Sequence, residues 1–173
     1  MNMNFKKSDE FIPFSPPWIG KDEEDEVLDS LRSGWITTGP KVKEFERRVA
    51  EYVNVKHAAA MYSCTDAMLL ALKVLGVDKG DEIITTTFTF ASTGHVICHH
   101  GAKPVFVDVD PETFNINPEL IEEKITPKTK GIIPVHYGGQ SCDMDPIMDI
   151  ASKHNLFVME DAAHAIGTKY KGR

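Results

Sequence analysis

The sequence predicts an α/β domain with a mostly parallel sheet and helices on both of its faces. The first reason is an alternation: from about residue 58 to residue 160, short and continuously apolar segments alternate with helical ones. Apolar strands of this kind are typical of parallel sheets, which are buried on both sides. The second reason is size, because 173 residues with 42% hydrophobic and 26% charged residues suit one ordinary globular domain.

The first third of the chain predicts an arm followed by two helices. Residues 1–20 are expected to form an N-terminal arm, because the stretch FIPFSPPWIG contains three prolines, which disfavour a helix. A helix is predicted over residues 21–33, where four acidic residues in the first turn complement the helix dipole and Gly34 ends the helix. Apolar residues at helical spacing predict a second amphipathic helix over residues 41–53.

The rest of the chain predicts strands and helices in turn. Short apolar segments predict strands at residues 58–62, 82–86, 105–109, 131–136 and 156–160. Amphipathic segments between them predict four helices. One begins at residues 63–66, and the others cover residues 92–100, 118–124 and 146–154. Ligands of such sheets bind beyond the carboxyl ends of the strands. The candidate site therefore consists of the polar, aromatic and small residues at 63–66, 86–92, 136–139 and 161–164.

The segment Ser63-Cys64-Thr65-Asp66 is a candidate phosphate-binding site. Free backbone N–H groups and the helix dipole at this point could bind an anion, most plausibly a phosphate. Ser63 could equally be an ordinary helix cap. The sequence contains neither a Walker lysine motif nor G-x-G-x-x-G, which argues against the two common nucleotide phosphate loops.

Asp161 is the sharpest candidate residue. It follows the apolar segment LFVM, and a carboxylate there is costly without a partner. A protonated ring nitrogen of a cofactor would be such a partner, although a helix cap is the plainer alternative. His164 is near enough in sequence to reach the same ligand, and Phe88 or Phe90 could stack on a flat ring or pack in the core. His136 could contact the site or satisfy a polar group in the core.

Charge and composition argue against several classes of partner. The formal net charge of −7 argues against a nucleic-acid-binding surface. No apolar run approaches the ~20 residues of a membrane span, and the first ten residues lack the apolar core of a signal peptide. Three widely spaced cysteines fit the reduced thiols of a cytoplasmic protein. His95 and His99 have a zinc-binding spacing but no third ligand, so no metal site is expected.

Six segments in order resemble the DegT/DnrJ/EryC1/StrS family of sugar aminotransferases, which use pyridoxal 5′-phosphate (PLP) on the fold-type-I scaffold. These segments are WITTGPKVKEFE, YSCTDAMLLAL, GDEIITTTFTFAST, GAKPVFVDVD, KTKGIIPVHYGG and VMEDAAHAIGTKYKGR. The resemblance implies that residues 21–173 are the N-terminal part of the large PLP-binding domain. It also implies a homodimer that moves an amino group from glutamate to a 4-keto nucleotide sugar, in cell-surface polysaccharide or amino-sugar biosynthesis.

The resemblance assigns a role to each site residue. The cofactor-binding residues it implies are Thr65 and Asp66 at the phosphate, Phe90 stacked on the ring, Asp161 at the ring nitrogen and His164 near the ring hydroxyl. Thr38 and His136 are expected near the substrate. Cys64 stands where the motif often has glycine and is not interpreted as a nucleophile.

The resemblance places the Schiff-base lysine and the small C-terminal domain beyond Arg173, so no catalytic residue is assigned and this chain alone is expected to be inactive. Lys169 and Lys171 are too close to Asp161 to serve. Three alternatives remain: a sugar dehydratase of the same family, with histidine in place of the lysine; a non-catalytic module that binds a phosphate-bearing ligand; and an unrelated α/β fold that binds a nucleotide directly.

Overall fold

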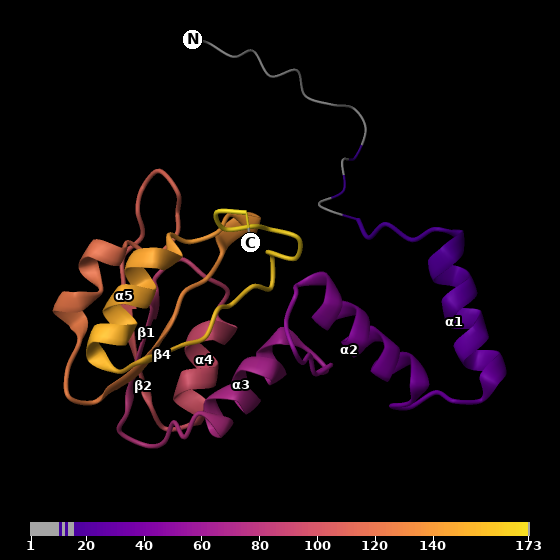
Figure 1. Ribbon diagram of the computed structural model, residues 1–173, viewed down its shortest axis with the longest axis horizontal. Coiled ribbons are helices and arrows are strands. Elements are labelled where there is room, and N and C mark those ends of the chain that lie inside the picture. Colours follow the sequence, from indigo (N-terminus) through magenta and orange to yellow (C-terminus); the bar gives the residue numbers. More distant parts are fainter. Residues whose placement is uncertain (1–10, 12, 14–15, 173) are drawn as a thin grey trace, which may run out of the picture. The chain divides into compact units, whose positions relative to one another are not determined.

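The computed structural model describes residues 11, 13 and 16–172, so most of the predicted arm lies outside the described residues. The chain divides into two compact units, Met1–Ala58 and Ala59–Arg173 (Figure 1). No helix in the described part of the chain is both long and apolar enough to cross a membrane.

The first unit contains the two predicted helices. Helix α1 covers Lys21–Ser33, and helix α2 covers Pro40–Tyr52. The Glu23 carboxylate accepts a hydrogen bond of 2.6 Å from the backbone N–H of Gly20 at the start of α1, and Gly34 ends that helix in a left-handed conformation with φ of 72°. The bounds of α1 are as predicted. Helix α2 begins one residue earlier, because proline suits the first helical position.

The second unit is built on a sheet of four parallel strands, which confirms the predicted sheet type. The strands are β1 (Glu82–Thr86), β2 (Lys103–Val107), β3 (Thr129–Ile133) and β4 (Phe157–Val158). Their order across the sheet is β2-β1-β3-β4, and each neighbouring pair is parallel. Their carboxyl ends therefore lie at the same edge of the sheet.

Helices cover both faces of this sheet, again as predicted. They are α3 (Cys64–Val74), α4 (Ser92–His99) and α5 (Met144–His154), with three 3-10 helices, η1 (Pro118–Leu120), η2 (Glu122–Lys124) and η3 (Tyr137–Gly139). Side chains alternate between the faces along a strand. Ile83 and Ile133 accordingly pack with buried residues of α3 and α4.

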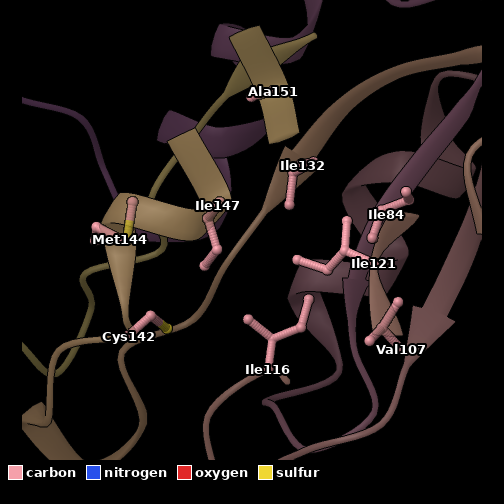
Figure 2. Packing of buried hydrophobic residues seen from close by; sticks show 9 residues of the cluster. All are labelled: Ile84, Val107, Ile116, Ile121, Ile132, Cys142, Met144, Ile147 and Ala151. Atoms are coloured by element: carbon pink, nitrogen blue, oxygen red, sulfur yellow. The ribbon is translucent and has the colours of Figure 1, made fainter. Parts of the chain in front are cut away.

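The neighbouring isoleucines, Ile84 and Ile132, point to the other face, where they pack with α5. Figure 2 shows this cluster, which consists of Ile84, Val107, Ile116, Ile121, Ile132, Cys142, Met144, Ile147 and Ala151. The two clusters hold α3 and α4 on one face and α5 on the other. The start of α3 and the loops after the strands are thereby fixed relative to the sheet.

Several predicted elements differ from those observed. Strand β3 begins two residues earlier and ends three residues earlier than predicted, α5 begins two residues earlier, and β4 is shorter than predicted. The strand predicted over residues 58–62 is wrong, because the sheet has no strand there and an apolar segment becomes a strand only when a neighbouring backbone pairs with it. The helix predicted over residues 118–124 is two 3-10 helices, η1 and η2. Strand β2 begins two residues before the predicted start, and Val109 instead forms an isolated antiparallel bridge with Ile116.

Candidate functional site

Asp161 lies at the carboxyl end of the sheet, in a backbone position that the neighbouring strand fixes. Its N–H donates to the carbonyl of Pro134 at 2.9 Å, and its carbonyl accepts from the N–H of His136 at 3.1 Å. These bonds form a parallel bridge that continues the pairing of β3 with β4. The residue is only 5% exposed. A buried carboxylate is thus held at the edge where parallel sheets bind ligands.

Three donors surround the Asp161 side chain. The Thr93 hydroxyl donates to Oδ2 at 2.9 Å, and the backbone N–H of Ala163 donates to Oδ1 at 3.2 Å. The Cys64 thiol donates to Oδ1 at 3.7 Å. Burial, and then the negative charge of Asp161, raise the pKa of the Cys64 thiol, which keeps it protonated as a donor. That Cys64 is not a nucleophile stays a prediction.

The Cys64 contact brings the start of α3 to Asp161. Ser63 caps α3: its side-chain oxygen accepts from the backbone N–H of Asp66 at 3.1 Å. The plainer interpretation of Ser63, a helix cap, is therefore correct. A phosphate at this helix start would share the N–H of Asp66 with the Ser63 oxygen. Thr65 is partly exposed and Asp66 is exposed, so both are accessible at the helix start.

Phe88 and Phe90 have different surroundings. Phe88 packs in a cluster of rings, with centroid distances of 4.5 Å to Tyr137 and 5.7 Å to Phe114. The Phe90 side chain is 79% exposed and lies between β1 and α4. Phe90 is therefore the more open of the two candidate rings, whereas Phe88 packs against two other rings and is 42% exposed.

His136 is buried, and both of its ring nitrogens have partners. Nδ1 accepts from the backbone N–H of Cys142 at 3.1 Å, so the ring hydrogen is on Nε2, which lies 2.8 Å from Oε2 of Glu160. This hydrogen bond lowers the pKa of Glu160. His136 thus ties the loop after β3 to the residue before Asp161. Its expected closeness to the substrate remains a prediction, but a direct hydrogen bond from its ring to a substrate would require one of these contacts to open.

His164 and the loop after β3 also lie together. The His164 side chain is exposed, and its carbonyl oxygen approaches Gly139 so closely that a Cβ there would be 2.9 Å from it. Gly139 has φ of 84°, a conformation that favours glycine. Thr168 donates to the carbonyl of Gly139 at 2.6 Å. The second glycine of PVHYGG thus permits the loop to pack against residues 161–168.

Thr38 belongs to the first unit, whereas the other predicted site residues belong to the second. Thr38 is exposed, and its carbonyl accepts from Nε1 of Trp35 at 3.0 Å. A Cβ on Gly39 would lie 2.2 Å from the same nitrogen, so the indole packs against a backbone that only glycine allows. The loop WITTGP therefore has a defined local conformation.

The residues that sequence reasoning missed are partners of the predicted ones. Thr93 is fully buried against Asp161, and Glu160 pairs with His136. Buried Asn115 donates from Nδ2 to the carbonyls of Gln140 and Ser141 and accepts from the N–H of Tyr137. No spacing pattern indicates these contacts, because the partners are between 22 and 68 residues apart in the chain.

A cavity of about 830 Å³ lies beside α5, and Asn115, Cys142 and Tyr170 are among the residues that line it. None of the predicted site residues lines this cavity. We place the candidate site at Asp161 because the buried carboxylate, its donors and the start of α3 meet there, at the carboxyl edge of the sheet.

Solved structures share this fold. The apo-form of the putative sugar aminotransferase Spr1654 from Streptococcus pneumoniae is 43% identical, with a TM-score of 0.91 over 94% of this chain and 44% of that chain. Its PMP-form gives a TM-score of 0.87 at 43% identity, over 90% of this chain and 43% of that one. The chain therefore has the α/β fold of solved aminotransferases, as predicted.

The chain belongs to the DegT/DnrJ/EryC1/StrS aminotransferase family, whose model matches residues 17–173. The spore coat polysaccharide biosynthesis protein SpsC of Bacillus subtilis is 54% identical to it over 168 residues. That alignment covers 97% of this chain and 43% of SpsC, so the chain spans less than half the length of this curated relative.

Proposed function

We propose that the protein carrying this chain is a PLP-dependent sugar aminotransferase. Asp161 carries the proposal: a buried carboxylate, oriented by donors on both oxygens, lies beside the start of α3. The family membership and the PMP-form of a relative with the same fold support it. PLP, when bound, accepts the amino group of the donor and passes it to the ketone of the acceptor.

The chemistry of the residues present fits this cofactor. The Asp161 carboxylate can accept a hydrogen bond from a protonated ring nitrogen, which its charge would keep protonated. The exposed Phe90 ring can stack on the pyridine ring. The start of α3, at Thr65 and Asp66, can bind a phosphate through backbone N–H groups and the helix dipole. His164 would lie near the ring hydroxyl.

The proposal also extends to the two substrates of the reaction. We propose glutamate as amino donor and a 4-keto nucleotide sugar as acceptor, with Thr38 and His136 near the acceptor. The segments WITTGP and PVHYGG support this choice by their resemblance to enzymes that aminate such sugars. The name of the relative SpsC, a spore coat polysaccharide biosynthesis protein, supports a product used in cell-surface polysaccharide.

We also propose a cytoplasmic homodimer whose Schiff-base lysine lies outside this chain. Lys171 does not fit that role, because its ammonium is paired with Asp145, which raises the pKa of the lysine. Exposed apolar side chains in the first unit, among them Val27, Leu31 and Phe45, would suit a subunit contact. The three cysteines are free, as reduced thiols would be.

The proposal is tested by the intact mass of the natural gene product after incubation with PLP and reduction with borohydride. A chain at least about twice this length, with one reduced cofactor on a lysine beyond Arg173, is the expected result. A long chain without the adduct would overturn the aminotransferase proposal in favour of a dehydratase or a phosphate-ligand-binding module. A natural chain that ends at Arg173 would also contradict it.

A further inference from the structure

The most completely buried hydroxyl at the site belongs to a residue that the proposed cofactor would not touch. Thr93, in the first turn of α4, has a fully buried side chain. Its Oγ1 donates to Oδ2 of Asp161 at 2.9 Å. A buried hydroxyl that donates to a carboxylate restricts the rotation of the carboxylate plane, and it is costly to leave unpaired.

A second threonine, Thr89, contacts the Thr93 hydroxyl, and the hydrogen bond to Asp161 fixes the direction of that contact. The hydroxyls of Thr89 and Thr93 lie 2.8 Å apart, and either oxygen could be the donor in that contact. The single hydrogen of Thr93 is used on Asp161, so Thr89 must donate to Thr93. A relay of two hydroxyls therefore runs from the loop after β1, through the start of α4, to the carboxylate.

The other carboxylate oxygen is held separately. Oδ1 accepts from the N–H of Ala163 at 3.2 Å and from the Cys64 thiol at 3.7 Å. These donors come from the loop after β4 and from α3, whereas Thr93 comes from α4. Among the contacts described for Asp161, Thr93 is thus the donor that fixes the orientation of Oδ2.

We propose that Thr93 is a positioning residue, which orients the Asp161 carboxylate toward the ring nitrogen of the cofactor while Thr89 holds the Thr93 hydroxyl in place. This inference rests on the proposed function, because it assumes that the ring nitrogen of PLP or PMP faces Asp161. Thr93 acts through Asp161 and does not itself contact the cofactor.

The structure offers a matched control for removing the Thr93 hydroxyl. Thr85, in β1, is also fully buried, and its hydroxyl donates to the carbonyl of Ile133 at 2.8 Å. The substitutions Thr93→Val and Thr85→Val each remove one buried hydroxyl and nearly conserve volume. Only the first removes a donor to Asp161. Thr93→Ser keeps the hydroxyl and serves as the rescue variant.

The experiment titrates the natural gene product and the three variants with PMP. Thr93→Val is expected to raise the dissociation constant for PMP about tenfold, which is typical of losing one hydrogen bond to a charged group. Thr85→Val and Thr93→Ser are expected to bind within about twofold of the natural protein. Equal PMP affinity of Thr93→Val and Thr85→Val would overturn the positioning role.

A second readout separates positioning from a general loss of stability. The ¹⁵N resonance of the ring nitrogen in bound, labelled PMP reports whether that nitrogen carries a proton. It is expected to show a proton in the natural protein, Thr93→Ser and Thr85→Val, and a shift toward the unprotonated nitrogen in Thr93→Val. An unchanged resonance in Thr93→Val would overturn the inference alone. Failure of the natural protein to bind PMP at all would overturn the proposed function and this inference together.

Discussion

The Sγ atom of Cys64 lies 3.7 Å from Oδ1 of Asp161, although the two residues are 97 positions apart in the chain. This contact joins the start of α3 to the carboxyl end of the sheet beyond β4. The segment at residues 63–66, an ambiguous candidate in sequence, and the sharper candidate Asp161 thereby become one site. A phosphate at the helix start and a ring nitrogen at the carboxylate would belong to one ligand, which is the arrangement that PLP requires.

The same contact predicts how the three cysteines react. Cys98 is exposed and should react first with iodoacetamide at pH 8. Cys64 is exposed as well but should react more slowly, because partial burial of its thiol and the charge of Asp161 raise its pKa. Cys142 should stay unmodified, because it is buried and its pKa is raised to about 12. Peptide masses over a time course give this order.

Unfolding in urea provides the control for the cysteine order, since all three thiols should then react at similar rates. Modification of Cys142 in the folded protein as fast as that of Cys98 would contradict the packing of the cluster in Figure 2.

The pair formed by His136 and Glu160 predicts a pH-dependent stability. The hydrogen bond from His136 lowers the pKa of Glu160 from 4.5, so the ionised form stabilises the fold above that pH. This contribution is lost as the pH falls through the lowered pKa. Glu160→Gln should therefore lower the free energy of unfolding at neutral pH by less than about 1 kcal/mol, because exposed charges are screened.

Urea unfolding of Glu160→Gln and the natural protein at several pH values measures this difference. It should disappear once the pH is well below 4.5, where Glu160 is protonated even in the folded state. The exposed Glu112 offers a control, since Glu112→Gln should change little at any pH. If the difference in unfolding free energy between Glu160→Gln and the natural protein grew as the pH falls, it would contradict this prediction.

Two glycines predict opposite effects of the same substitution. A Cβ on Gly131, in β3, would lie 2.3 Å from the Phe157 ring, so Gly131→Ala should destabilise the fold by about 1–3 kcal/mol. A Cβ on Gly94, in α4, would make an ordinary contact of 3.5 Å with Phe106. Gly94→Ala should therefore stabilise the fold by up to ~1 kcal/mol, since alanine favours helix. Thermal unfolding of both variants checks the signs, and a Gly131→Ala variant as stable as the natural protein would refute the account of the β3–β4 packing.

Tyr170 predicts how firmly residues 161–172 are held to α5. Its hydroxyl donates to Oδ1 of Asp143 at 2.6 Å and accepts from the N–H of Asp145 at 3.1 Å. Tyr170→Phe should cost about 1–3 kcal/mol of unfolding free energy. Tyr62 is 99% exposed, so Tyr62→Phe should have no measurable effect. Equal unfolding midpoints in urea for the two variants would show that the Tyr170 hydroxyl contributes nothing.

Much of the fold and part of the site follow from local sequence. Strand β1 lies at its predicted residues, because an apolar run between turn residues is a local signal. Asp161 was found for the same reason, since a carboxylate directly after an apolar strand stands out. The strand predicted at residues 58–62 fails because pairing depends on a neighbouring backbone, which no local pattern reports. The sequence does not predict a role for Thr93, because its contact with the site is made to a residue 68 positions away.

The central claim is that the Asp161 carboxylate faces the cofactor ring, and Asp161→Asn tests it most directly. Asp108 also follows a strand, and its Oδ1 accepts from Thr87 and from the N–H of Val109, so Asp108→Asn is the matched control. PMP titration of the natural gene product should show that Asp161→Asn weakens binding roughly 10–100-fold, while Asp108→Asn changes it little. Equal affinity of the two variants for PMP would contradict the claim.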